Sequence, residues 1–209
     1  MRLEGSCQCG KVRFTVESDT PYPYQFCYCS ICRKCTGGAF GCNIMGRRDT
    51  LAVTRGARQV KRYHARIHTR GGKARAAVGW RAFCGACGTH LWLEDKRWPD
   101  GVWPNAGAID TELPVPPSYT LIMTDYKPAW VPWPRARARK FPEYPQQSIA
   151  AWHRAHKLDG GASRTPHRRL CATPHFLHEI SYIVERKIAS TQSAISWRAC
   201  CLHTLVCTP

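Results

Sequence analysis

Long apolar segments are missing from this sequence. No run approaches the roughly 20 consecutive apolar residues that a membrane-spanning helix requires. The opening residues, Met1 to Cys7, lack the apolar core of a secretory signal peptide. We therefore expect a cytoplasmic protein without a membrane partner. In that reducing compartment, clustered cysteines are typical of metal ligands rather than of disulfides.

Acidic residues are scarce as well. The 209-residue chain has 14 Asp and Glu against 31 Lys and Arg, which gives a formal net charge of +17. Eleven of the basic residues lie between Gly46 and Arg81, where Asp49 is the single acidic residue. Such a segment can attract nucleic-acid phosphates or a small acidic substrate, and an ordinary solvated loop has the same composition. Because aromatic residues are not interleaved with the basic ones, a groove for single-stranded nucleic acid is not favoured.

Long helices are excluded from much of residues 1–145. Eight prolines lie between Pro99 and Pro134, and elsewhere polar and apolar residues alternate over short runs that are typical of half-buried strands. Hydrophobic content is 44%, with eight Trp, which is enough for a packed core. We predict a mainly β, compact multi-sheet domain with short helices over residues 1–145. Its strands are expected at Lys11–Val16, Phe40–Met45, Asp49–Thr54, Gln59–His64, Thr89–Glu94, Val102–Ile109 and Ser118–Met123.

The composition changes after residue 145. Residues 146–209 form a basic C-terminal extension that we expect to be irregular or partly helical, and in part disordered. A short helix is predicted over Gln146–His156, followed by a linker over Gly160–Pro166. Apolar residues at helical spacing predict an amphipathic helix over His175–Ala189.

Seven of the thirteen cysteines fall into three tight clusters. The clusters are Cys7-x-Cys9, Cys27-x-Cys29-x-x-Cys32 and Cys84-x-x-Cys87. A four-thiolate zinc site takes two pairs, and the triplet leaves a second zinc one ligand short. Closed sites are usually structural, whereas an open coordination position permits chemistry. The cysteine count therefore predicts two metal ions with different duties.

Glycines adjoining the first and third clusters favour their pairing around one ion, because they ease the tight turns of a zinc knuckle. That ion would cross-link distant parts of the chain, so its binding free energy would become folding free energy. The number of ligands in the middle cluster is open, because Cys35 follows Cys32 at the spacing Cys32-x-x-Cys35. If Cys35 is a fourth ligand, the second site is closed and structural too. Other partitions of the nine early cysteines are also open.

The other candidate ligands have no ligand spacing to these clusters. Cys42 lies in an apolar stretch and is predicted to be a core residue. We interpret His64, His68 and His90 as surface or hydrogen-bonded histidines rather than as metal ligands.

Three segments carry the cysteine clusters together with characteristic neighbours. They are Gly5-Ser-Cys-Gln-Cys-Gly-Lys-Val-Arg-Phe14, Cys27-Tyr-Cys-Ser-Ile-Cys-Arg-Lys34 followed by Gly38-Ala-Phe40, and Phe83-Cys-Gly-Ala-Cys-Gly-Thr-His-Leu-Trp92. In this order they resemble the glutathione-dependent formaldehyde-activating (GFA) family, which also has segments related to Asn105–Asp110 and Lys127–Trp130. The resemblance spans about residues 3–145, and the three ordered clusters make it specific.

The resemblance implies a compact, mainly β fold with two Zn²⁺ ions per chain. By the family pattern, the structural zinc would be held by Cys7, Cys9, Cys84 and Cys87. The catalytic zinc would be held by Cys27, Cys29 and Cys32. The implied activity is that of an S-(hydroxymethyl)glutathione synthase, a carbon–sulfur lyase that joins formaldehyde to glutathione. A related aldehyde and a similar thiol are further substrates that such an enzyme could take.

Two other functions are open. A non-enzymatic zinc module could bind nucleic acid or another polyanion through Gly46–Arg81, and the same family includes centromere protein V, a chromosome-associated member. A purely structural zinc scaffold is the third interpretation. The three-cysteine cluster favours the enzyme, because a binding module has no need of an unsaturated metal site.

Overall fold

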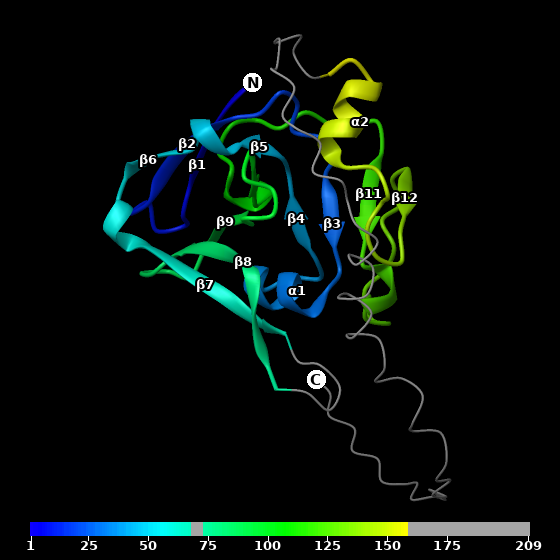
Figure 1. Ribbon diagram of the computed structural model, residues 1–209, viewed down its shortest axis with the longest axis horizontal. Helices are drawn as coiled ribbons and strands as arrows, with labels where there is room; N and C mark the ends of the chain where they lie inside the picture. The colour runs from blue at the N-terminus through cyan, green and yellow to red at the C-terminus, as the bar shows by residue number, and fades with distance from the viewer. Residues whose placement is uncertain (68–72, 159–209) are drawn as a thin grey trace, which may run out of the picture. The chain divides into compact units, whose positions relative to one another are not determined.

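Three β-sheets contain most of the regular secondary structure of the described chain (Figure 1). The computed structural model describes residues 1–67 and 73–158, and residues 1–67 and 75–158 belong to one structural unit. The two α-helices found in these ranges are both seven residues long. Neither is long and apolar enough to cross a membrane. The mainly β fold with short helices that the sequence predicts is confirmed.

The first sheet places the N-terminal cysteines at one end of a hairpin. Its order is β1-β2-β6, with β1 at Arg2–Ser6, β2 at Arg13–Glu17 and β6 at Ala52–Arg55, all antiparallel. The alternation predicted for the second strand is present, because Phe14 and Val16 are buried and Leu3, opposite Val16, is buried too. The turn between β1 and β2 contains Cys7 and Cys9.

The second sheet contains a long hairpin that was not expected. Its order is β5-β10-β9-β8-β7, with β5 at Gly46–Arg47, β10 at Gly101–Pro104, β9 at His90–Glu94, β8 at Arg75–Cys84 and β7 at Val60–Ile67. Strand β8 is absent from the predicted strands. It begins Arg-Ala-Ala-Val-Gly, whose small residues give no clear alternation, and pairing with β7 and β9 fixes its conformation instead. Strand β8 carries Arg81 and ends at Cys84.

The third sheet leads directly into a helix. Its order is β12-β11-β3-β4, with β12 at Ala138–Lys140, β11 at Tyr119–Ile122, β3 at Gln25–Cys27 and β4 at Gly41–Asn43. Strand β11 is parallel to both neighbours, whereas β3 and β4 are antiparallel. Helix α1 (Ser30–Thr36) begins three residues after β3 and lies at its end (Figure 1). The segment from Cys27 to Cys32 therefore turns from a strand into a helix.

One hydrophobic core joins the sheets, and two of the cysteines belong to it. Phe14 of the first sheet packs against Trp92 of the second, with ring centroids 5.0 Å apart. Cys7 and Cys84, which are 2% and 0% exposed, lie in the same buried cluster. Beside it, buried Glu94 accepts a hydrogen bond from Trp92 Nε1 at 2.8 Å and pairs with Arg48. The environment of Cys7 and Cys84 is therefore part of what holds the fold together.

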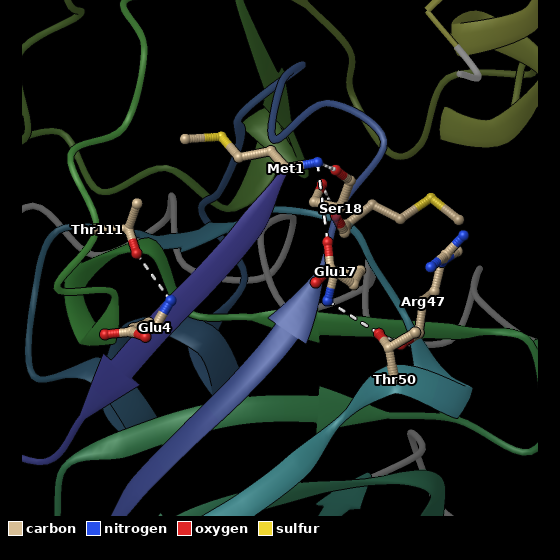
Figure 2. A network of polar contacts seen from close by, with 8 residues as sticks. Met1, Glu4, Glu17, Ser18, Arg47, Thr50 and Thr111 are labelled. Atoms are coloured by element: carbon tan, nitrogen blue, oxygen red, sulfur yellow. Dashed lines mark hydrogen bonds and ion pairs between the residues drawn. The ribbon is translucent and has the colours of Figure 1, made fainter. Parts of the chain in front are cut away.

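Polar contacts fix the start of β1 against its neighbours (Figure 2). The Met1 amino group donates to Ser18 O at 2.7 Å, and Thr50 Oγ1 accepts from Glu17 N at 2.9 Å. Thr111 Oγ1 likewise accepts from Glu4 N at 2.8 Å. Each contact satisfies a main-chain or terminal group that the small sheet leaves without a strand partner. They hold the hairpin whose far end bears the first two cysteines.

The short helix predicted over Gln146–His156 is confirmed as α2 (Ile149–Ala155). Ser148 caps its first turn by accepting a hydrogen bond from Ala151 N at 3.1 Å. The buried His153 side chain contacts Tyr22 O through Nε2 at 2.8 Å, so this helix packs on residues next to β3. The predicted linker at Gly160–Pro166 and the predicted helix at His175–Ala189 lie outside the described residues.

Gly56 allows the turn after β6 to pack on the chain beside the N-terminal cysteines. It has φ +71°, and a Cβ at this position would lie 2.0 Å from Lys11 O. We expect Gly56→Ala to lower the free energy of unfolding by about 3 kcal/mol or more, because left-handed strain and a backbone collision add. Gly37→Ala is the control, since Gly37 has φ +68° but open space around it, and about 1 kcal/mol is expected. Denaturant unfolding of both variants measures the difference, and equal losses would contradict the collision.

Candidate functional site: two cysteine clusters

Four cysteine sulfurs from two hairpin turns meet at one point. The Sγ atoms of Cys7, Cys9, Cys84 and Cys87 all lie within 4.8 Å of one another. Each pair is presented by a tight turn, in which Gly10 N donates to Cys7 O at 2.9 Å and Gly88 N donates to Cys84 O at 2.8 Å. Cys7 and Cys84 are buried, whereas Cys9 and Cys87 are exposed. The structure thus brings together the four residues that the sequence assigned to one ion.

Donors around this four-cysteine cluster favour negatively charged sulfur. Thr89 Oγ1 lies 3.2 Å from Cys87 Sγ, and this contact is the main reason that the pKa of Cys87 is lowered to about 5. Burial acts to raise the pKa of Cys7, but the Val12 N–H, 3.1 Å from its sulfur, and the neighbouring thiols outweigh burial and lower it. The pKa of Cys9 is raised to about 11, so the lowered values belong to Cys7 and Cys87. Four sulfurs this close together fit the four positions of a tetrahedral zinc ion. This cluster therefore could hold one metal ion.

Three further sulfurs meet where β3 runs into α1. The Sγ atoms of Cys27, Cys29 and Cys32 also lie within 4.8 Å of one another. Cys29 is the N-cap residue of α1, and its sulfur accepts a hydrogen bond from Cys32 N at 3.3 Å. Cys27 and Cys32 are 2% and 5% exposed, whereas Cys29 is half-buried. Three convergent thiols fit a zinc ion with one open position, and Cys29 is the most exposed residue of this three-cysteine cluster.

The thiols of the three-cysteine cluster differ in pKa. Hydrogen bonds with Cys27 and Cys29, with help from the nearby Arg81, hold the pKa of Cys32 well below its usual range. Hydrogen bonding with Cys29 and Cys32 and burial raise the pKa of Cys27 well above its usual range. A hydrogen bond with Cys27 lowers the pKa of Cys29, but Cys32 and burial outweigh it and raise the value to about 11. Cys32 therefore carries the negative charge of the cluster most readily.

Arg81 is a site residue that the sequence did not single out. It is 8% exposed, and its Nη2 lies 3.5 Å from Cys32 Sγ. Among the basic residues described between Gly46 and Arg81, it alone is buried. In the sequence it is one of eleven similar positive charges, three residues before Cys84. Only the pairing of β8 with its neighbours shows that this guanidinium faces the cysteines.

Aromatic and imidazole groups complete the surroundings of the three-cysteine cluster. Tyr144 is 54% exposed, and its pKa is raised by burial of the hydroxyl end and then by the sulfurs of Cys27 and Cys29. His90 is buried, and neither of its ring nitrogens has a hydrogen-bond partner in the described ranges. Burial, and then the positive charge of Arg81, lowers the pKa of His90 to about 4. We conclude that His90 is neutral at pH 7.

The remaining candidate ligands stay outside both clusters. Cys35 does not join the three-cysteine cluster, although it lies one helical turn from Cys32. Cys42 packs against the core as predicted, and burial raises its pKa to about 12. His64 and His90 are in neither group, and His68 lies outside the described residues. The interpretation of His90 as a surface or hydrogen-bonded histidine is wrong, because it is buried and its ring nitrogens have no partner among the described residues.

Comparison with known proteins identifies the family. The model of the family described as "Glutathione-dependent formaldehyde-activating enzyme" matches residues 2–125, a range that contains all seven clustered cysteines. This chain belongs to the GFA family. A Halomonas elongata protein, provisionally named a glutathione-dependent formaldehyde-activating enzyme, is 46% identical over 163 residues, which cover 77% of this chain and 100% of that protein. A solved Rhodobacter sphaeroides structure is 26% identical, covers 55% of this chain and 92% of its own, and superposes with a TM-score of 0.42.

Both cysteine clusters and Arg81 lie within residues 2–125, the range that the GFA family model matches. Tyr144 and helix α2 follow it in the sequence. The part of this chain that the family describes therefore contains both candidate metal sites.

Proposed function

We propose that this protein is a zinc-dependent carbon–sulfur lyase that works in the synthetic direction. It would join formaldehyde, or a related aldehyde, to glutathione or a similar thiol, as an S-(hydroxymethyl)glutathione synthase does. Membership of the GFA family and the name of the Halomonas relative support the substrates. The observation that carries the proposal is the three-cysteine cluster, whose half-buried Cys29 opens a set of convergent thiols to solvent.

The two sets of thiols support a proposal of two zinc ions per chain. We assign the structural ion to the four-cysteine cluster, half of which belongs to the hydrophobic core. We assign the catalytic ion to the three-cysteine cluster. Zinc bound by three thiolates leaves a fourth position, where it lowers the pKa of the group that occupies it. Residues 1–145 would then be the catalytic domain and residues 146–209 an extension of it.

The reaction needs a sulfur anion and a carbonyl carbon. The thiol gives up its proton, its sulfur lone pair forms the new C–S bond, and the carbonyl oxygen takes a proton to become the hydroxyl of RS–CH₂OH. Cys29 is the most exposed of the three cysteines, so the entering thiol would approach beside it. Arg81 contributes positive charge beside Cys32, where it would favour a substrate sulfur that has given up its proton.

The proposed activity predicts faster exchange between free and glutathione-bound formaldehyde. Two-dimensional NMR exchange spectroscopy on a mixture of formaldehyde and glutathione measures this rate with and without protein. We expect the protein to raise the rate at least about tenfold over the uncatalysed exchange, because bound reactants no longer meet by diffusion. No acceleration, together with DNA binding that weakens steeply with salt, would instead support the polyanion-binding module.

A further inference from the structure

Arg81 is a buried cation whose hydrogen-bond partner is a sulfur atom. Its Nη2 lies 3.5 Å from Cys32 Sγ, and no carboxylate of the described residues is recorded within ion-pair distance of it. Its Nε–H is buried and has no acceptor in the same part of the chain. Buried charges are nearly always paired, because an unpaired charge loses its hydration without compensation. Negative sulfur in the three-cysteine cluster is therefore the counter-charge of Arg81.

The charge of the cluster changes when a thiol substrate joins it. Three thiolates and one Zn²⁺ carry a single negative charge in total, and Arg81 neutralises it. A substrate sulfur that enters as a thiolate adds another negative charge, which is costly in a buried site unless a cation is near. A thioether or an alcohol adds no charge. The Arg81 guanidinium consequently favours binding of a thiol substrate in its thiolate form.

The burial of its three cysteines decides from which side a ligand can reach the three-cysteine cluster. Cys27 and Cys32 are almost fully buried, so a ligand approaches at Cys29. The three sulfurs are within 4.8 Å of one another, which puts a sulfur that joins them within a few ångströms of the Arg81 guanidinium. At that range Coulomb attraction between unit charges is large even at an intermediate effective dielectric constant.

We propose that Arg81 is the residue that makes the site specific for substrate sulfur in its thiolate form. This inference rests on the proposed function, because it assumes that a thiol joins the three-cysteine cluster. Arg81 then acts on the charge of the bound sulfur and not on the carboxylates of glutathione. It would determine the specificity for thiolate substrates without being a metal ligand itself.

Binding of two matched ligands tests this role. Isothermal titration of the zinc-loaded protein compares glutathione with S-methylglutathione, which has the same carboxylates but cannot form a thiolate. For Arg81→Gln we expect glutathione binding to weaken about 10- to 100-fold, as is usual when one partner of a buried charge pair is removed. S-Methylglutathione binding and zinc content should stay unchanged. Arg58→Gln is the control, because Arg58 is an exposed positive charge in the short 3-10 helix Ala57–Gln59. This variant should change the affinity of neither ligand.

Other results would overturn the proposal. Equal weakening of both ligands would show that Arg81 binds the shared carboxylates, and no weakening would show that it only supports the fold. If Arg81→Gln releases zinc, Arg81→Lys keeps the charge and should retain the preference for glutathione, so its loss in that variant would also overturn the role. Wild-type protein that binds neither ligand would refute the proposed function itself, and this inference with it.

Discussion

Replacing Cys29 by serine should abolish activity while leaving the fold intact. The half-buried Cys29 is the thiol through which solvent reaches the three-cysteine cluster, and a serine hydroxyl stays protonated at neutral pH, so it is a poor zinc ligand. We expect kcat/KM for formaldehyde and glutathione to fall at least about 100-fold, which corresponds to roughly 2.7 kcal/mol of lost transition-state stabilisation. The NMR exchange rate measures the loss.

The fold should survive this substitution for a local reason. Cys29 is the N-cap of α1, and serine is among the preferred residues at that position because its oxygen accepts the same main-chain hydrogen bond. The unfolding midpoint of Cys29→Ser should therefore stay close to that of the wild type. An active variant would show that the cluster is not catalytic, and an unfolded one would show that it is structural.

Replacing Cys84 by serine should have the opposite outcome. Cys84 is fully buried, belongs to the core and lies within 4.8 Å of three other sulfurs. Binding of a structural zinc contributes about 10–16 kcal/mol in zinc-finger peptides, more than the roughly 5–15 kcal/mol by which a domain is stable. We therefore expect Cys84→Ser to lose about 5 kcal/mol or more in free energy of unfolding, so that little folded protein remains. Guanidinium unfolding followed by circular dichroism measures it.

Cys42 supplies the matched control for Cys84. It is a half-buried thiol that packs on the core, but it belongs to neither cluster. Cys42→Ser should cost only about 1–3 kcal/mol, the penalty for burying a hydroxyl without a good partner. A chelator should destabilise the wild type and Cys42→Ser by equal amounts, and should leave Cys84→Ser little changed. Equal stability losses for the two variants would contradict a structural metal at Cys84.

The three groups of cysteines could be recognised in the sequence because each group is local, whereas the four-cysteine cluster joins two of these groups across 75 residues. Cys7-x-Cys9 and Cys84-x-x-Cys87 lie in turns whose glycines and spacing point both thiols the same way. The exclusion of Cys35 also has a local cause. Cys35 lies three helical positions beyond Cys32, which is a rise of about 4.5 Å away from the helix start, where Cys27 and Cys29 lie.

The contribution of Arg81 could not be predicted in this way. Its contact with Cys32 crosses 49 residues of sequence and depends on the pairing of β8 with β7 and β9. Strand β8 itself was missed, because its small residues give no alternation. Strand pairing over long sequence separations is thus the physical information that one sequence does not supply.

The division of labour between the two clusters is tested most directly by counting zinc. Elemental analysis of purified protein, with circular dichroism on the same samples, compares the wild type with a Cys27/Cys29/Cys32→Ser triple variant. We expect two zinc ions per wild-type chain, and one per chain of a variant that keeps the wild-type spectrum. A folded variant that still holds two ions, or a variant that loses both ions and its fold, would contradict separate structural and catalytic sites.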